Sequence, residues 1–248
     1  MCTVTYLPLA DDNFILTSNR DEGIMRKPAL PPATYKIAGK EIIFPKDGEA
    51  GGTWIGVEKT GRVICLMNGA FVQHERELPY RMSRGQVVLD ALTADDFENF
   101  LNNYLLEKIE PFTIVAFDWR EGLRRWELRW DGQQRHIKSL SHTPQIWSSA
   151  TLYNDDMHTK RKEWFKDWLS QNTDYQVNKI RQFHKTAGEG DPITDLRTER
   201  GFLRTVSVTT IEKLHSQIEM TYEDLREETA NIEHSSLSIE HIVFPAKC

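Results

Sequence analysis

The 248 residues, enough for one large or two small domains, include 31 basic and 37 acidic side chains and carry a net charge of −6 at pH 7. Such a mildly acidic protein is a poor candidate for binding nucleic acid through its phosphates, because that mode needs a surplus of lysine and arginine. Hydrophobic residues make up 39% and charged residues 27% of the chain, which is typical of a soluble globular protein and excludes general disorder.

Three hairpins are predicted in the first 70 residues. Apolar runs separated by turn residues place their strands at 3–9 and 13–17, at 35–37 and 41–44, and at 54–58 and 62–67. Between the first two hairpins, residues 19–33 are rich in charge, glycine and proline, and we expect a long ordered loop there. A sheet that grows by local antiparallel pairing follows.

Helices and a meander are predicted in the middle of the chain. Apolar residues recur at helical spacing over 84–92, after the capping candidate Ser83, and over 94–106. Strands at 112–119, 123–130 and 134–139, separated by Glu121-Gly122 and Asp131-Gly132, then predict a second sheet.

The last third of the chain repeats this order. We predict helices over 155–170 and 175–184, a loop over 186–201, and strands over 205–211, 217–222 and 237–243. Blocks of strands and helices without regular βαβ alternation indicate an α+β fold rather than a doubly wound sheet.

The cysteines and the N-terminus indicate a compartment. Cys2, Cys65 and Cys248 form no C-x-x-C pair, so neither a disulfide framework nor a zinc finger is expected. The first residues lack the cationic segment of a secretory signal, and the longest apolar run, 112–117, is too short to cross a membrane. We therefore expect a cytoplasmic protein without a membrane span.

Cys2 is the most informative single residue. Methionine aminopeptidases remove Met1 when the second residue is small, which would leave a cysteine with both a thiol and a free α-amine. The ordinary pKa of an α-amine is about 7.7 to 8.0 and that of a thiol about 8.5, so a proton can pass between them easily. Cys2 would then supply nucleophile and base together. A small second residue is also common by chance, so Cys2 alone does not decide the function.

A second group of polar residues follows the strand predicted at 13–17. Asn19, Arg20, Asp21 and Glu22 supply an amide, a guanidinium and two carboxylates. A hairpin that turns near residues 11–13 brings residues 2–4 opposite residues near 20. An acid there can orient the terminal amine, and Arg20 can lower the pKa of the thiol. The alternative is an ordinary charged cluster at a surface turn.

These features together resemble the NRDE family, also called the transport and Golgi organisation 2 (TANGO2) family. Besides Cys2 and Asn-Arg-Asp-Glu at 19–22, the resemblance rests on Gly-Gly-Thr-Trp-Ile-Gly at 51–56, Met-Asn at 67–68, Ser-Arg-Gly-Gln at 83–86 and Arg-Thr at 204–205. The family is in turn similar to N-terminal nucleophile hydrolases of the choloylglycine and penicillin V acylase type. The resemblance implies one domain over residues 1–248, folded as a four-layer αββα sandwich.

The resemblance also implies roles for individual residues. Cys2 would be the nucleophile, Asp21 would contact its amine, and Asn68 would donate to the oxyanion. Arg204 matches a late arginine near the nucleophile, whereas those hydrolases place the early arginine where this chain has Ser18, two residues before Arg20.

Three further residues are predicted to help in binding at this site: Asn19, Gly69 through its backbone N–H, and Ser149. Ser149 stands where many relatives carry an asparagine. The eight histidines show no metal-ligand spacing, so no metal is predicted. Trp119, Trp126 and Trp130 are interpreted as core residues rather than a stacking surface for nucleic acid.

Two functions are therefore expected as alternatives. In the first, an N-terminal cysteine hydrolase cleaves a small non-peptide amide through an acyl-enzyme and needs no cofactor. In the second, suggested by the resemblance, a binding or trafficking protein carries haem or an acyl lipid on the same scaffold. The sequence names neither the substrate nor the oligomeric state.

Overall fold

A computed structural model describes residues 3–226 and, for the backbone, residues 239–245. The chain divides into two compact units, one formed by the described parts of 1–26, 143–148 and 153–245, the other by 27–142 and 149–152. Each unit thus combines segments that are far apart in the sequence. The single domain expected over residues 1–248 stays a prediction.

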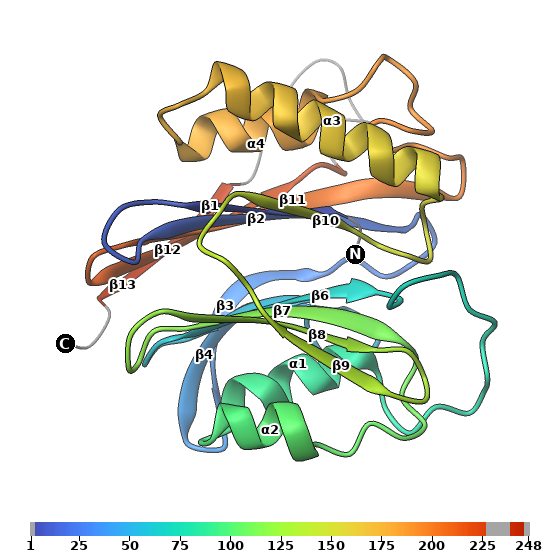
Figure 1. Ribbon diagram of the computed structural model, residues 1–248. Coiled ribbons are helices and arrows are strands. Elements are labelled where there is room, and N and C mark those ends of the chain that lie inside the picture. Colours follow the sequence, from blue (N-terminus) through green and yellow to red (C-terminus); the bar gives the residue numbers. More distant parts are fainter. Residues whose placement is uncertain (1–2, 227–238, 246–248) are drawn as a thin grey trace. The chain divides into compact units, whose positions relative to one another are not determined.

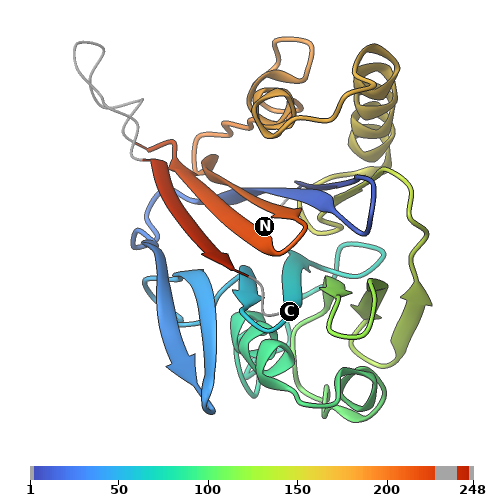
Figure 2. The ribbon, with the colours of Figure 1, turned by 90° about the vertical axis from the view of Figure 1, so that its left-hand side faces the viewer.

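The first unit contains a six-stranded antiparallel sheet in the order β10-β1-β2-β11-β12-β13. Figure 2 shows its C-terminal strands, coloured orange to red, lying side by side. Its strands are β1 (Thr3–Pro8), β2 (Phe14–Gly23), β10 (Gln145–Ser148), β11 (Leu203–Leu214), β12 (Gln217–Asp224) and β13 (Ile239–Pro245). The first hairpin of the chain therefore pairs with the last strands, because β2 takes β11 as its second neighbour.

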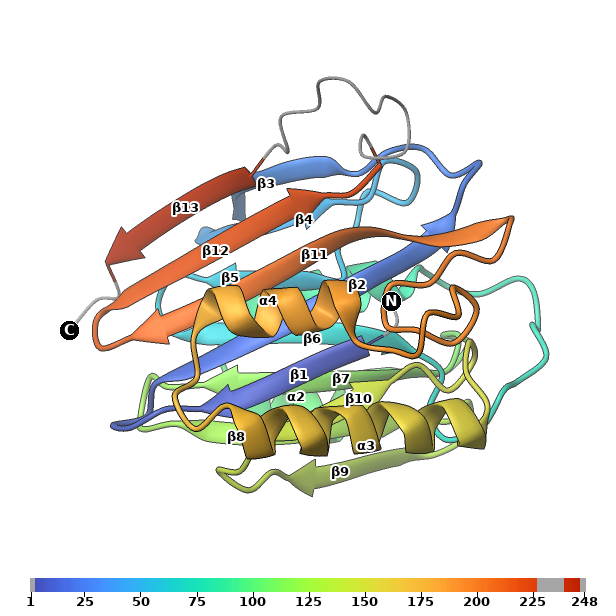
Figure 3. The same ribbon diagram turned by 90° about the horizontal axis from the view of Figure 1, so that it is seen from above.

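Two helices cover one face of this sheet: α3 (Asp155–Gln171) and α4 (Val177–Thr186). Seen from above, they lie across the strands (Figure 3). Leu7 and Ile15 point up from β1 and β2 and pack against Phe165 of α3 and Phe183 of α4. Because side chains alternate along a strand, the odd-numbered residues of β1 and β2 face these helices.

Strand β2 differs from its prediction in a way that matters for the site. Residues 19–23 continue the strand instead of opening a loop, and each is paired with β11. Polar residues 17–21 are buried, which disguised the strand as a loop in the sequence pattern. The loop proper is short, since β3 begins at Leu30.

The second unit contains a seven-stranded antiparallel sheet in chain order from β3 to β9. Its strands are β3 (Leu30–Ile37), β4 (Lys40–Lys46), β5 (Ile55–Glu58), β6 (Arg62–Asn68), β7 (Phe112–Asp118), β8 (Arg124–Trp130) and β9 (Arg135–Ser139). The hairpins at 30–68 and the meander at 112–139 share this one sheet, so the separate second sheet predicted for the meander is wrong. Pro31 and Pro32 lie in the edge strand β3, where a missing N–H is tolerated.

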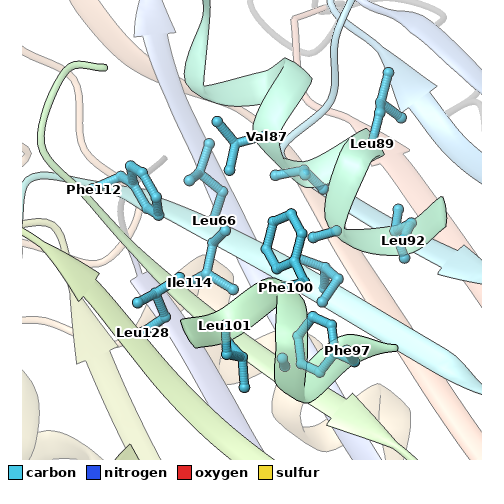
Figure 4. Close-up of a cluster of buried hydrophobic side chains, with 14 of the residues drawn as sticks. Leu66, Val87, Leu89, Leu92, Phe97, Phe100, Leu101, Phe112, Ile114 and Leu128 are labelled. Atoms are coloured by element: carbon cyan, nitrogen blue, oxygen red, sulfur yellow. The ribbon is translucent and has the colours of Figure 1, made fainter. Parts of the chain in front are cut away.

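Helices α1 (Arg84–Thr93) and α2 (Phe97–Asn103) pack on this sheet (Figure 1). Leu66 and Ile114 of the sheet contact Val87 of α1 and Phe100 of α2 in one apolar cluster (Figure 4). Ser83 caps α1 as predicted, by accepting a hydrogen bond from the backbone N–H of Gln86. The second helix begins three residues later than predicted, because Asp96 caps it instead of Thr93.

The remaining predicted elements agree with the structure at most positions. Both helices of the first unit, the loop after α4 and the strands β11 and β12 lie where the sequence indicates them. Of the strand predicted over 237–243, residues 239–243 belong to β13, and 237–238 lie outside the described residues. Cys2 and Cys248 also lie outside them. Across the described part of the chain, no helix combines the length and apolarity needed to span a bilayer.

Candidate functional site

The polar motif at 19–22 lies in the middle of the first unit's sheet. Asn19 pairs with Thr3 of β1 on one side and with Val208 of β11 on the other. Further along, Asp21 pairs with Thr205 and Glu22 with Arg204. The early motif and the late Arg-Thr pair, separated by about 180 residues in the sequence, are therefore direct neighbours across two strands.

Asn19 is fully buried beneath α4. Its Nδ2 donates to the backbone oxygens of His184 (3.1 Å) and Leu196 (3.0 Å), and its Oδ1 lies 2.7 Å from His184 Nδ1. Both amide hydrogens are used inside the unit, so the Asn19 side chain has none to offer a ligand. This corrects the binding role predicted for it: Asn19 fastens β2 to α4 and to the following loop.

His184 completes that network. Its Nε2 lies 2.7 Å from the Thr5 hydroxyl, and burial lowers the pKa of His184 to about 3. The ring is therefore neutral, with Nδ1–H donating to Asn19 and Nε2 accepting from Thr5. A neutral tautomer held at both nitrogens is a structural group rather than an acid or base.

Asp21 is held by two hydroxyl groups. It is 2% exposed; its Oδ1 accepts a hydrogen bond from Thr205 Oγ1 at 2.6 Å, and its Oδ2 accepts one from the Tyr153 hydroxyl. The Thr205 oxygen in turn accepts the backbone N–H of Thr198 at 2.9 Å, which orients its own hydrogen toward Asp21. Both carboxylate oxygens are thereby fixed in direction.

Tyr153 is itself fixed by a buried cation. The guanidinium carbon of Arg161, one and a half turns into α3, lies 3.3 Å from the centre of the Tyr153 ring. Arg161 is fully buried, and its Nη2 donates to the backbone oxygens of Thr194 (3.2 Å) and Asp195 (3.1 Å). Cation–ring contacts of this kind stabilise by about 0.5–2 kcal/mol and hold the ring in place.

The arginines of the motif belong to the other face of the sheet. Arg20 Nη2 lies 3.3 Å from Glu22 Oε2, and Arg26 Nε lies 3.5 Å from the same oxygen. Arg204 is directly opposite Glu22, and side chains of residues that pair directly share a face. Arg20 and Arg204 therefore lie on one face of the sheet and Asp21 on the other, because side chains alternate along a strand.

In the second unit, the segment after β6 is tightly held. Asn68 is half-buried, and the Gly69 backbone N–H donates to the Pro111 oxygen at 3.0 Å. Since that hydrogen is already used, the Asn68 side chain rather than the Gly69 amide is the available donor for an oxyanion. Gly69 has φ +77°, and a Cβ there would meet Thr151 Cγ2 at 2.8 Å. The glycine is required by the close approach of the 149–152 segment.

Ser149 acts on the same segment. It is fully buried, its Oγ donates to the Asn68 backbone oxygen at 2.8 Å, and it lies 3.1 Å from Thr151 Oγ1. Its hydroxyl thus holds the backbone that carries Asn68. An asparagine would offer a longer side chain at this position.

The predicted site residues therefore fall into two groups. The first unit brings together Arg20, Asp21 and Arg204, and the second brings together Asn68, Gly69 and Ser149. Sequence reasoning missed Tyr153, Thr205 and Arg161, whose contacts with the motif depend on pairing that no local pattern reveals. Among the residues that the structure describes, no group of three His, Cys, Asp or Glu side chains is placed to hold a metal ion.

Comparison with solved structures defines the class of fold. The Caenorhabditis elegans ortholog of N-acylethanolamine-hydrolyzing acid amidase matches with a TM-score of 0.57 and 12% identity over 85% of this chain and 92% of its own. A variant of the conjugated bile acid hydrolase from Clostridium perfringens matches with a TM-score of 0.56 and 9% identity over 99% and 97%. The chain thus has an N-terminal nucleophile hydrolase-like α+β fold, and the predicted fold class is confirmed.

The sequence comparison assigns the family. The profile described as "Transport and Golgi organisation 2" matches residues 1–233, so this chain belongs to the TANGO2 family. The mouse protein named Transport and Golgi organization 2 homolog is 34% identical over 110 residues. That match covers 42% of this chain and 38% of the mouse protein's length.

Proposed function

We propose that the protein hydrolyses a small non-peptide amide with Cys2 as an N-terminal nucleophile. After removal of Met1, the thiol attacks the amide carbonyl carbon and the α-amine takes the thiol proton. The amine passes that proton to the leaving nitrogen as the C–N bond breaks, which leaves a thioester on Cys2. Water, activated by the same amine, then cleaves the thioester and restores the thiol.

The observation that carries this proposal is the pairing around the start of β1. Thr3, to which Cys2 is bonded, pairs with Asn19, and β2 continues directly into Arg20 and Asp21. The proposal assigns the thiol to the face of Val4 and Arg20, where a guanidinium favours the thiolate. Asp21 then serves the amine from the opposite face of the strand.

Two arginines and an amide complete the proposed machinery. Arg20 and Arg204 share a face with one carboxylate, Glu22, and supply positive charge for the thiolate and the developing oxyanion. The role of oxyanion donor is proposed for Asn68, in the second unit, because its side-chain amide is half-exposed and its backbone is fixed by Ser149.

The size of the substrate is supported separately. The first unit has a cavity of about 270 Å³ bordered by Thr198, Arg204 and Thr205, next to the hydroxyl that holds Asp21. This volume suits a small polar molecule rather than a peptide chain. The two structural relatives are named as an amidase and a bile acid hydrolase, which supports an amide of modest size.

The mechanism is tested at the N-terminus itself. Intact-mass spectrometry of the purified protein should show loss of Met1, and 2-cyanobenzothiazole, which condenses only with a free 1,2-aminothiol, should label the N-terminal peptide. Cys2→Ser should abolish that labelling and any amidase turnover, whereas Cys65→Ser, a change at a buried cysteine of β6, should leave both intact. Retained Met1, or full turnover by Cys2→Ser, would contradict the proposal.

Non-catalytic binding of haem or an acyl lipid is the second candidate. It is favoured by Ser149, whose hydroxyl is engaged by Asn68 and Thr151 and so offers no amide where relatives carry one. Titration with haem followed at the Soret band, and with a long-chain fatty acid followed by calorimetry, tests it. Saturable binding that survives Cys2→Ser, together with no turnover of amides, would support this candidate over hydrolysis.

A further inference from the structure

An N-terminal cysteine that carries an acyl group faces a side reaction. The neutral α-amine can attack its own thioester through a five-membered ring: a C–N bond forms, the C–S bond breaks, and the proton lost by nitrogen moves to sulfur. The product is an N-acyl cysteine with a free thiol. Because an amide is far more stable than a thioester, this S-to-N transfer would inactivate the protein permanently. The problem arises only if the proposed function holds, and the inference rests on it.

The structure contains a device suited to prevent this transfer. Asp21, two residues along β2 from the partner of Thr3, accepts hydrogen bonds from Thr205 on one oxygen and from Tyr153 on the other. A carboxylate anchored at both oxygens keeps its remaining lone pairs in a fixed direction. An amine that donates to such a carboxylate has its own lone pair fixed in turn.

The anchoring is more extensive than a single contact needs. Thr205 is oriented by the Thr198 N–H, and Tyr153 by the guanidinium of Arg161 at 3.3 Å from its ring. Arg161 is fully buried, and its Nε and Nη1 have no hydrogen-bond partner within the described chain. Burial of a guanidinium with two unpaired nitrogens is unfavourable for folding, so a purely structural account of Arg161 is weak.

We propose that Tyr153 and Thr205 hold Asp21 so that the Cys2 amine points its lone pair away from the acyl carbon and toward water. Tyr153, Thr205 and Arg161 are positioning residues in this scheme, since they act through Asp21. Their effect is to direct the acyl group to water instead of to the protein's own nitrogen. Loss of either hydroxyl frees the carboxylate to turn and lets S-to-N transfer compete.

The test follows the fate of one acetyl group. Protein is treated with p-nitrophenyl acetate, and the N-terminal peptide is analysed by mass spectrometry before and after hydroxylamine, which removes a thioester but not an amide. Tyr153→Phe keeps the ring under Arg161 and removes only the hydroxyl. Thr205→Val keeps the shape and removes the hydroxyl, whereas Thr205→Ser keeps the hydroxyl in a smaller side chain.

In the wild type and in Thr205→Ser, hydroxylamine should remove the acetyl group from the N-terminal peptide. In Tyr153→Phe and Thr205→Val, the hydroxylamine-resistant share should rise by about tenfold or more, the factor that matches one hydrogen bond to a charged group. The resistant peptide should also no longer condense with 2-cyanobenzothiazole. A loss of stability alone cannot move the acetyl group from sulfur to nitrogen, so thermal unfolding of each variant separates the two effects.

The outcomes distinguish this inference from the function beneath it. If Cys2 is acetylated in every variant and hydroxylamine removes the acetyl group equally from all, the positioning role is wrong while the nucleophile stands. If the wild type keeps Met1 or is not acetylated at Cys2, both are wrong. If Tyr153→Phe fails to fold, the Thr205→Val and Thr205→Ser pair still decides the matter.

Discussion

Asn19 Oδ1 and His184 Nδ1 lie 2.7 Å apart although 165 residues separate them in the sequence. Through this bond, the first residue of the motif that defines the family resemblance is part of the helix–sheet interface of its unit. Asn19 and Asp21 point to the same face of β2, and fixing the first restrains the second. The motif therefore combines a structural residue with candidate chemical ones.

Replacement of Asn19 tests this structural role. Asn19→Ala leaves the backbone oxygens of His184 and Leu196 without their donor, and each unsatisfied buried group destabilises by about 1–3 kcal/mol. We expect the free energy of unfolding, measured by urea denaturation, to fall by about 3 kcal/mol or more. Asn178→Ala, at an exposed position of α4, is the matched control and should change little. Equal effects of the two changes would contradict the assignment.

His184 predicts how stability depends on pH. Burial lowers the pKa of His184 from 6.5 to about 3 in the folded protein, so the unfolded chain binds more protons between these values. Stability from this group is therefore complete above pH 6.5 and is lost as the pH falls toward 3, by about 1.4 kcal/mol per pH unit. Urea denaturation at several pH values should show a steeper slope for the wild type than for His184→Gln. Parallel slopes would show that His184 does not titrate in this way.

Gly69 predicts a difference between two glycines. Gly69 and Gly122 have similar left-handed backbones, with φ of +77° and +86°, but a Cβ on Gly69 would meet Thr151 at 2.8 Å while one on Gly122 would meet nothing within 4 Å. Gly122→Ala should destabilise by about 1 kcal/mol through backbone strain alone. Gly69→Ala should destabilise by about 2 kcal/mol or more, since a clash adds to the strain. Thermal unfolding of both variants checks this, and equal shifts would rule out the contact.

Ser149 predicts an effect on Asn68. Ser149→Ala removes the hydrogen bond to the Asn68 backbone oxygen, and we expect the free energy of unfolding to fall by about 1 kcal/mol. If Asn68 has the proposed role, kcat of any amidase activity should fall together with it, as it should more strongly in Asn68→Ala. Thr151→Val removes the hydroxyl 3.1 Å from Ser149 without touching Asn68 and serves as the control. An unchanged kcat in Ser149→Ala would argue against positioning through this bond.

The sequence predicts local elements well and their assembly poorly. Helix α1 could be placed because Ser83 and the apolar spacing after it are visible in the pattern, and the hairpins because glycine turns punctuate them. Strand β10 was missed, since four residues carry too little periodicity. Residues 19–22 were predicted in a loop because buried polar side chains resemble exposed ones in a sequence. Tyr153 and Thr205 could not be connected to Asp21 at all, since their contacts depend on which distant strand joins β2.

The central position of β2 in its sheet also sets the order in which this sheet can form. One neighbour of β2, the strand β1, is made within the first residues of the chain, whereas the other, β11, ends only at Leu214. During synthesis, the motif strand must wait with one edge unpaired until most of the chain has left the ribosome. Pairing over such a separation is slow, and an open strand edge is a site of misassociation. The residues proposed to do the chemistry are thus among the first to be synthesised and among the last to reach their partners.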